Sequence, residues 1–144
     1  MLFRKITPCL LLFFGVFFSN AQQSIDGFTL MNADTDSPIT ELTNDIQINS
    51  QDLAGVNLNI RANTNPQLVG SVLLTLSGQV AASRNENVAP YALFGDISGD
   101  YLPGNLPLGS YVLSATPFTG ANQTGTAGDS RTIQFSIVIP NPNL

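Results

Sequence analysis

The feature that most constrains the fold is an alternation of apolar and polar residues that recurs in short runs along the chain. Apolar residues two positions apart share one face of a β-strand, so each run fits a strand with one buried face. After residue 21 the sequence contains no long segment with the 3.6-residue period of an amphipathic helix. The alternation therefore predicts an all-β domain. The clearest inward sets are Val56, Leu58 and Ile60; Val72, Leu74 and Leu76; Tyr111, Leu113 and Ala115; and Ile133, Phe135, Ile137 and Ile139.

Clusters of turn-forming residues separate the runs. Residues 32–38, 63–66 and 120–129 are rich in Asn, Asp, Gly, Thr or Pro, which favour turns and loops. The runs amount to about seven to eight short strands at roughly 8–15-residue spacing, a pattern typical of an antiparallel β-sandwich. A small closed barrel also fits this pattern. Uneven strand lengths and prolines at the expected edges favour the sandwich.

The stretch from residue 86 to residue 101 is expected to lie at the centre of the sheet arrangement. Residues 91–94 form a short apolar run that we expect to be a core strand. Pro90 precedes this run, and Gly95 and Asp96 follow it as a turn. The neighbouring apolar runs are its expected partners.

The first 21 residues have the features of a cleavable secretory signal peptide. Arg4 and Lys5 precede an apolar run over residues 6–18, and small residues occupy positions 19 and 21. The run of ~13 residues is short of the ~20 that a membrane-spanning helix needs. We therefore expect a signal at residues 1–21, one domain over residues 24–139, and a tail or the start of a linker at residues 140–144. The expected location is secreted or at the cell surface, with no membrane insertion after signal removal.

Composition excludes several classes of function for the exported chain. Loss of Arg4 and Lys5 leaves three arginines against ten acids, a net charge of 3 − 10 = −7. A strongly acidic chain is a poor nucleic-acid binder because it repels phosphate. The only cysteine lies in the signal and the chain has no histidine. A disulfide framework, a Ser-His-Asp triad, a thiol nucleophile and an N/S zinc site are thus excluded.

Two pairs of aspartates are the candidate cation ligands. Asp34 and Asp36 flank one expected turn, and Asp96 and Asp100 flank another. Calcium prefers several oxygen ligands, which carboxylates and backbone carbonyls supply. Neither pair matches an EF-hand loop, and Asp residues also stabilise turns without a metal. The same carboxylates allow a glycan hydrolase or lyase only if two of them face each other across a cleft. We expect the chain not to be an enzyme.

One aromatic residue is a candidate for sugar contact. Tyr91 and Tyr111 fall at inward strand positions, whereas Tyr101 is expected in a loop and exposed. Asn105 is close to it in sequence. The sequence therefore predicts a weak sugar platform at Tyr101 and Asn105, in a carbohydrate-binding module that calcium could assist.

Three segments resemble bacterial immunoglobulin-like modules. These are a strand that ends in Gly (residues 72–78), a Pro-Tyr strand start (residues 86–93) and a Gly-x-Tyr-x-Leu-x-Ala strand (residues 106–115). Residues 132–137 are similar to the last strand of such modules, which occur in secreted, often carbohydrate-active or adhesive, multidomain proteins. The resemblance implies an immunoglobulin-like antiparallel β-sandwich in which Tyr111 holds the tyrosine-corner position. It also implies a non-catalytic structural, spacer or adhesion module, with neighbouring domains or an extracellular glycan or protein as partners.

Overall fold

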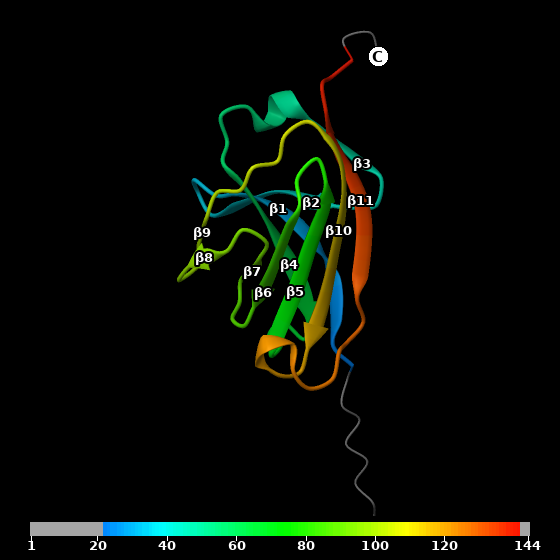
Figure 1. Ribbon diagram of the computed structural model, residues 1–144. Coiled ribbons are helices and arrows are strands. Elements are labelled where there is room, and N and C mark those ends of the chain that lie inside the picture. The colour runs from blue at the N-terminus through cyan, green and yellow to red at the C-terminus, as the bar shows by residue number, and fades with distance from the viewer. Residues whose placement is uncertain (1–21, 142–144) are drawn as a thin grey trace, which may run out of the picture.

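The computed structural model of the protein describes residues 22–141, and these form two β-sheets packed face to face (Figure 1). The predicted all-β, sandwich-like fold is confirmed. The predicted signal peptide at residues 1–21 lies outside the described residues.

The first sheet, sheet A, is antiparallel throughout. Its strand order is β2 (Ser37–Leu42), β1 (Ser24–Asn32), β4 (Leu58–Asn65) and β7 (Tyr91–Ala92). The second sheet, sheet B, is antiparallel except at one edge, where β3 runs parallel to β11. Its strand order is β3 (Ile46–Asn49), β11 (Arg131–Val138), β10 (Gly109–Phe118), β5 (Ser71–Gly78) and β6 (Ala82–Glu86).

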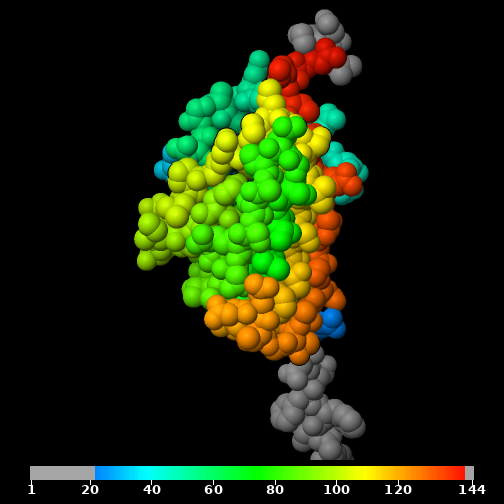
Figure 2. All heavy atoms as spheres, in the orientation of Figure 1, coloured from blue at the N-terminus to red at the C-terminus, as the bar shows by residue number. Residues whose placement is uncertain are grey.

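A small hairpin and two short 3₁₀ helices complete the described chain. Strands β8 (Asp96–Ile97) and β9 (Asp100–Tyr101) pair with each other, and the helices are η1 (Ser50–Leu53) and η2 (Ala121–Gln123). Neither helix has the length or apolar content needed to cross a bilayer. Figure 2 shows the yellow-green part of the chain, which contains β8 and β9, protruding from one side of the molecule.

The inward faces of the two sheets form one core, and its members follow the predicted alternation. On β5 and β10 the expected inward residues, among them Leu74 and Leu113, are fully buried. The rings of Tyr111 and Phe135 stack across neighbouring strands with centroids 5.0 Å apart. The prediction is wrong at Ile139, which is 70 % exposed because β11 ends one residue earlier.

Several strand boundaries differ from the sequence prediction. The expected core strand at residues 91–94 is only the two-residue β7, and β4 continues to Asn65 through the expected turn. Strand β2 was not expected, because it lies at a sheet edge and most of its side chains are exposed, so it lacks a buried periodic face. The parallel pairing of β3 also departs from the expected antiparallel sandwich.

A second, smaller core lies on the outer face of sheet A. It comprises Met31, Ala33, Ala92 and Tyr101. The β8–β9 hairpin brings Tyr101 against this face, so β1 is buried on both sides: Leu30 inward and Met31 outward. The outer face of a sandwich sheet is usually solvated. Here the β8–β9 hairpin covers part of the outer face of sheet A, and the candidate site residues lie around this hairpin.

Candidate functional site

The turn between β1 and β2 carries two of the predicted cation ligands. The Asp34 carboxylate accepts hydrogen bonds from the Asn57 backbone N–H (2.9 Å) and from Asn57 Nδ2 (2.7 Å). These bonds, the backbone one first, lower the pKa of Asp34. Asp36 has a positive φ of 54° and its Oδ1 accepts the Tyr101 backbone N–H at 2.9 Å. Both carboxylates thus tie the turn to other parts of the chain.

The β8–β9 hairpin carries the other pair. Asp96 Oδ2 accepts the Gly99 backbone N–H at 2.6 Å. Ser98 and Gly99, the two turn residues, have positive φ angles of 55° and 95°, as a type I′ hairpin turn requires. Asp100 is exposed beside Tyr101. The aspartate at the start of this turn therefore stabilises its backbone.

The structure brings the two turns together without assembling a cation cage. Asp36 contacts the backbone of β9, so the turns that contain the two predicted pairs are neighbours. Among residues 22–141, no group of three or more acidic, histidine or cysteine side chains is placed to hold a metal ion. Asp34, Asp36 and Asp96 are bonded to protein N–H groups, which is the turn-stabilising alternative. Calcium binding stays a prediction.

The predicted exposure of Tyr101 is wrong. Tyr101 is 5 % exposed and belongs to the outer core on sheet A. Burial raises the pKa of its hydroxyl, an effect that the nearby Arg61 guanidinium partly offsets. Asn105 is exposed in the loop after β9. Because the ring of Tyr101 faces protein, Tyr101 and Asn105 do not form an open sugar platform.

Asn59 is the residue that sequence reasoning missed. Its side chain is fully buried on the outer face of β4, where alternation suggested a solvent-facing polar residue. Asn59 Nδ2 donates to the carbonyl oxygens of Gly95 (2.9 Å) and Leu102 (2.7 Å), and Oδ1 accepts the Phe94 N–H at 3.1 Å. These bonds hold together the two ends of the segment that contains the β8–β9 hairpin, residues 94–102. No local sequence signal distinguishes this asparagine from its exposed neighbours.

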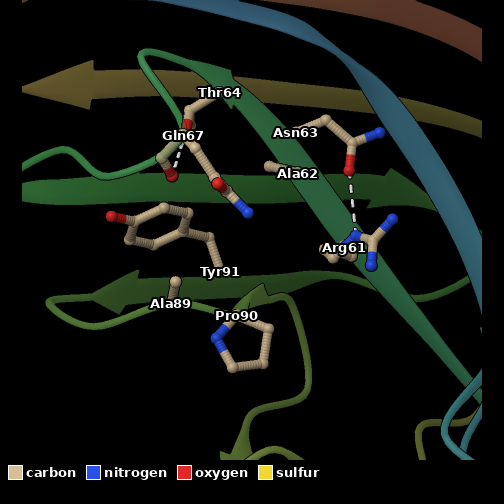
Figure 3. Close-up of a pocket in the computed structure, with 8 residues that line it drawn as sticks. All are labelled: Arg61, Ala62, Asn63, Thr64, Gln67, Ala89, Pro90 and Tyr91. Atoms are coloured by element: carbon tan, nitrogen blue, oxygen red, sulfur yellow. Dashed lines mark hydrogen bonds between the residues drawn. The ribbon is translucent and has the colours of Figure 1, made fainter.

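A pocket of ≈ 430 Å³ opens where β4 extends past the short β7. Residues 61–64 of β4 form one wall, Gln67 lies at one end, and residues 89–91 form the opposite wall. Figure 3 shows Arg61 and Asn63 across the opening from Tyr91 and Pro90. The Tyr91 hydroxyl is held at 2.8 Å by both the N–H and the carbonyl oxygen of Val69, which fixes that wall.

Hydrogen bonds across three strands orient the cation of this pocket. Arg61 Nε donates to Asn63 Oδ1 (2.9 Å), and Asn63 Nδ2 donates to Thr29 Oγ1 (2.9 Å). Thr29 in turn donates to Glu41 Oε1 (2.8 Å). In the described part of the chain the only ion pair is Arg84–Glu86. The pocket thus contains a positioned guanidinium with no directly paired carboxylate.

Comparison of the chain with protein-family models, with curated proteins and with solved structures finds no match in any of the three.

Proposed function

We propose that this protein is an exported, non-catalytic β-sandwich module of the immunoglobulin-like kind that acts as a structural spacer or adhesion unit. The observation that carries the proposal is the position of the chain ends. The described chain starts at one pole of the molecule and ends at the opposite pole (Figure 1). A module with ends at opposite poles holds its neighbours apart.

Strand pairing explains this separation of the ends. At the first pole, Ser24 bridges Asp129, and the Ile25 N–H donates to the Asp129 carbonyl oxygen at 3.1 Å. Strand β11 (Arg131–Val138) then runs away from that pole as the last strand of the described chain. At ~3.3 Å per residue, ten residues from position 129 to position 139 cover about 33 Å.

Fixed loops also favour a rigid spacer. Side chains from other strands and turns hold the segment that contains the β8–β9 hairpin. The Asp36 carboxylate accepts the Tyr101 N–H, and Asn59 donates to the carbonyl oxygens of Gly95 and Leu102. At the pole where the described chain starts, the Ser71 hydroxyl donates to Gly120 O at 2.7 Å and accepts the Gln123 N–H at 2.9 Å. Tyr111 donates to Pro107 O at 2.5 Å, the bond that the tyrosine-corner position implies.

Pulling the molecule by its ends tests the spacer proposal. A tandem array of the chain from Gln22 onward, extended in a force microscope, is expected to unfold one module at a time. Each step should release the whole described domain, because β11 is held between β3 and β10 and its bonds load together. Gradual extension at low force, without discrete steps, would contradict a load-bearing spacer.

Carbohydrate binding is the second candidate function, and the Arg61 pocket is the observation that favours it. The pocket volume of ≈ 430 Å³ lies in the range of small-molecule sites. Its walls combine fixed polar side chains with an apolar surface at Ala89 and Pro90. The pocket replaces Tyr101 and Asn105 as the site for this function. Melting of the protein with a panel of soluble polysaccharides tests it, because a ligand that binds only the folded state raises the midpoint.

A further inference from the structure

The pocket beside β4 combines a cation with a sheet edge that stays open. β7 pairs with β4 only at Arg61 and Ala62. Beyond these two residues, residues 63–65 of β4 pair with β1 on one side alone, whereas Leu58 also bridges Gly104 and the Ile60 carbonyl accepts the Leu93 N–H. The opening therefore sits where the outer face and the free edge of sheet A meet. It is bounded by side chains from two chain segments, residues 61–67 and 89–91, that are far apart in sequence.

The orientation of Arg61 leaves donors for a ligand. A guanidinium carries five N–H donors. Asn63 receives one of them and Thr29 a second at 3.5 Å. The Tyr101 hydroxyl also lies near the guanidinium, so N–H groups beyond those two bonds are available to a ligand. Because the bond to Asn63 fixes the Nε side, the guanidinium is held in place before a ligand arrives, which reduces the entropy lost on binding.

A carboxylate is the group that best matches this arrangement. Guanidinium and carboxylate form paired, charge-assisted hydrogen bonds. No carboxylate lines the pocket. Glu41, the acid in the hydrogen-bond chain, accepts the Thr29 hydroxyl at 2.8 Å and Asn63 Nδ2 at 3.5 Å. Glu41 offsets part of the charge of Arg61, so the site selects one carboxylate through direct contact rather than attracting polyanions from a distance.

The rest of the lining suits a sugar. Thr64 and Gln67 offer a hydroxyl and a carboxamide, which hydrogen-bond to sugar hydroxyls. Ala89 and Pro90 present an apolar wall opposite Arg61, and a sugar ring has an apolar C–H face. Leu68 and Val88, which are next to Gln67 and Ala89 in the sequence, are apolar residues with 70 % and 72 % exposure.

We propose that this pocket binds a carboxylated sugar residue, a uronate, and that Arg61 takes the carboxylate. Asn63 is a positioning residue that holds the guanidinium. Thr64 and Gln67 contact ring hydroxyls, and the ring packs on Ala89 and Pro90. This inference rests on the second candidate function, and it names the substrate class and the residues of that site. The competing occupant is a peptide that ends in a free carboxylate and lies along the open edge of β4.

Calorimetric titration with matched ligands tests the proposal. The probes are oligomers of galacturonate, glucuronate and mannuronate, each beside its methyl ester, which keeps the ring and removes the charge. The expected result is binding of at least one uronate oligomer and at least tenfold weaker binding of its ester. Arg61→Gln should weaken uronate binding about 10- to 100-fold, the loss expected for a charge-assisted hydrogen-bonded pair.

Control variants separate a site effect from a folding effect. Arg131→Gln removes the same charge from an exposed arginine on β11 that donates to the Asp26 carbonyl oxygen at 2.7 Å, and it should leave uronate affinity unchanged. If Arg61→Gln does not fold, Gln67→Ala, at an exposed loop position, should still weaken binding severalfold. In an ¹⁵N spectrum, uronate should shift the amides of the non-proline residues within 61–67 and 89–91.

Each other outcome overturns the proposal in a distinct way. Equal binding of acid and ester overturns the role of Arg61 but leaves carbohydrate binding intact. Binding of neutral sugars alone does the same. No binding of any sugar overturns both this inference and the second candidate function, while the spacer proposal is judged by the pulling experiment. Tighter binding of a short peptide, lost when its C-terminus is amidated, replaces the sugar with a peptide partner.

Discussion

At the scale of single residues, buried polar side chains fix the outer layer of sheet A. Asn59 forms hydrogen bonds with three backbone groups of residues 94–102, the segment that contains β8 and β9. An unsatisfied buried polar group costs about 1–3 kcal/mol. The asparagine is therefore worth more to the fold than an exposed polar residue of the same strand.

Replacement of Asn59 by alanine is expected to lower the free energy of unfolding by at least about 2 kcal/mol, because the Leu102 carbonyl and the Phe94 N–H lose their bonds to it. The Gly95 carbonyl keeps the Leu102 N–H as a partner. Urea denaturation measures the change. Asn105→Ala, at an exposed loop position, should change stability by less than about 0.5 kcal/mol. Equal effects of the two substitutions would show that the Asn59 bonds do not stabilise the fold.

The Asp34 carboxylate makes a pH-dependent contribution to the stability of the fold. Hydrogen bonds from Asn57 lower its pKa below the ordinary value of 3.8, so its stabilising contribution is present above that value. The contribution is lost as the pH falls through the lower, folded-state pKa. We expect Asp34→Asn to melt below the unsubstituted protein at pH 7, and the difference to shrink below pH 3.8. A difference that persists undiminished at pH 2 would show that the charge is not its source.

The sequence predicted side chains well where one face of a strand is buried. The inward residues of β5, β10 and β11 follow alternation up to the strand ends. The prediction fails on the outer face of sheet A, at Asn59 and Tyr101. Alternation assigns the second face of a sheet to solvent. Here the β8–β9 hairpin, which is distant in sequence, covers part of that face, and no local sequence pattern predicts this contact.

At the scale of elements, burial and pairing differ sharply between strands. β10 lies inside sheet B between β5 and β11, and Leu113 on it is fully buried. β8 and β9 pair through two residues each at the surface. Strands with buried neighbours on both sides open only in global unfolding, while small peripheral elements open locally.

Hydrogen exchange should reproduce this order. The amides of β10 are expected to exchange most slowly, at the rate of global unfolding, and those of β8 and β9 much faster. Native-state exchange followed by NMR measures both. Exchange of β8 and β9 as slow as that of β10 would mean that the hairpin is part of the cooperative core.

Element boundaries were predictable only where burial is periodic. β2 lacks that signal because its side chains are mostly exposed, and the parallel pairing of β3 with β11 depends on chain crossing, which local sequence does not encode. The pocket was missed for the same reason. Its two walls are brought together by the pairing of β4 with β7, about thirty residues apart in the chain.

At the scale of the whole molecule, a spacer requires a rigid body with its ends at opposite poles. Two sheets share one continuous core, and side chains bind the loops at both poles. Such a body holds the groups attached to its two ends at a fixed distance from each other. Its length is set by β11, which runs between the two poles.

The distance between the ends tests this claim most directly. Gln22→Cys and Ile139→Cys place spin labels at two exposed positions in a chain that begins at Gln22 and has no other cysteine. Pulsed electron resonance should give one narrow distribution centred at or above about 30 Å, as the strand rise along β11 requires. A broad distribution, or a centre well below that distance, would contradict the rigid spacer.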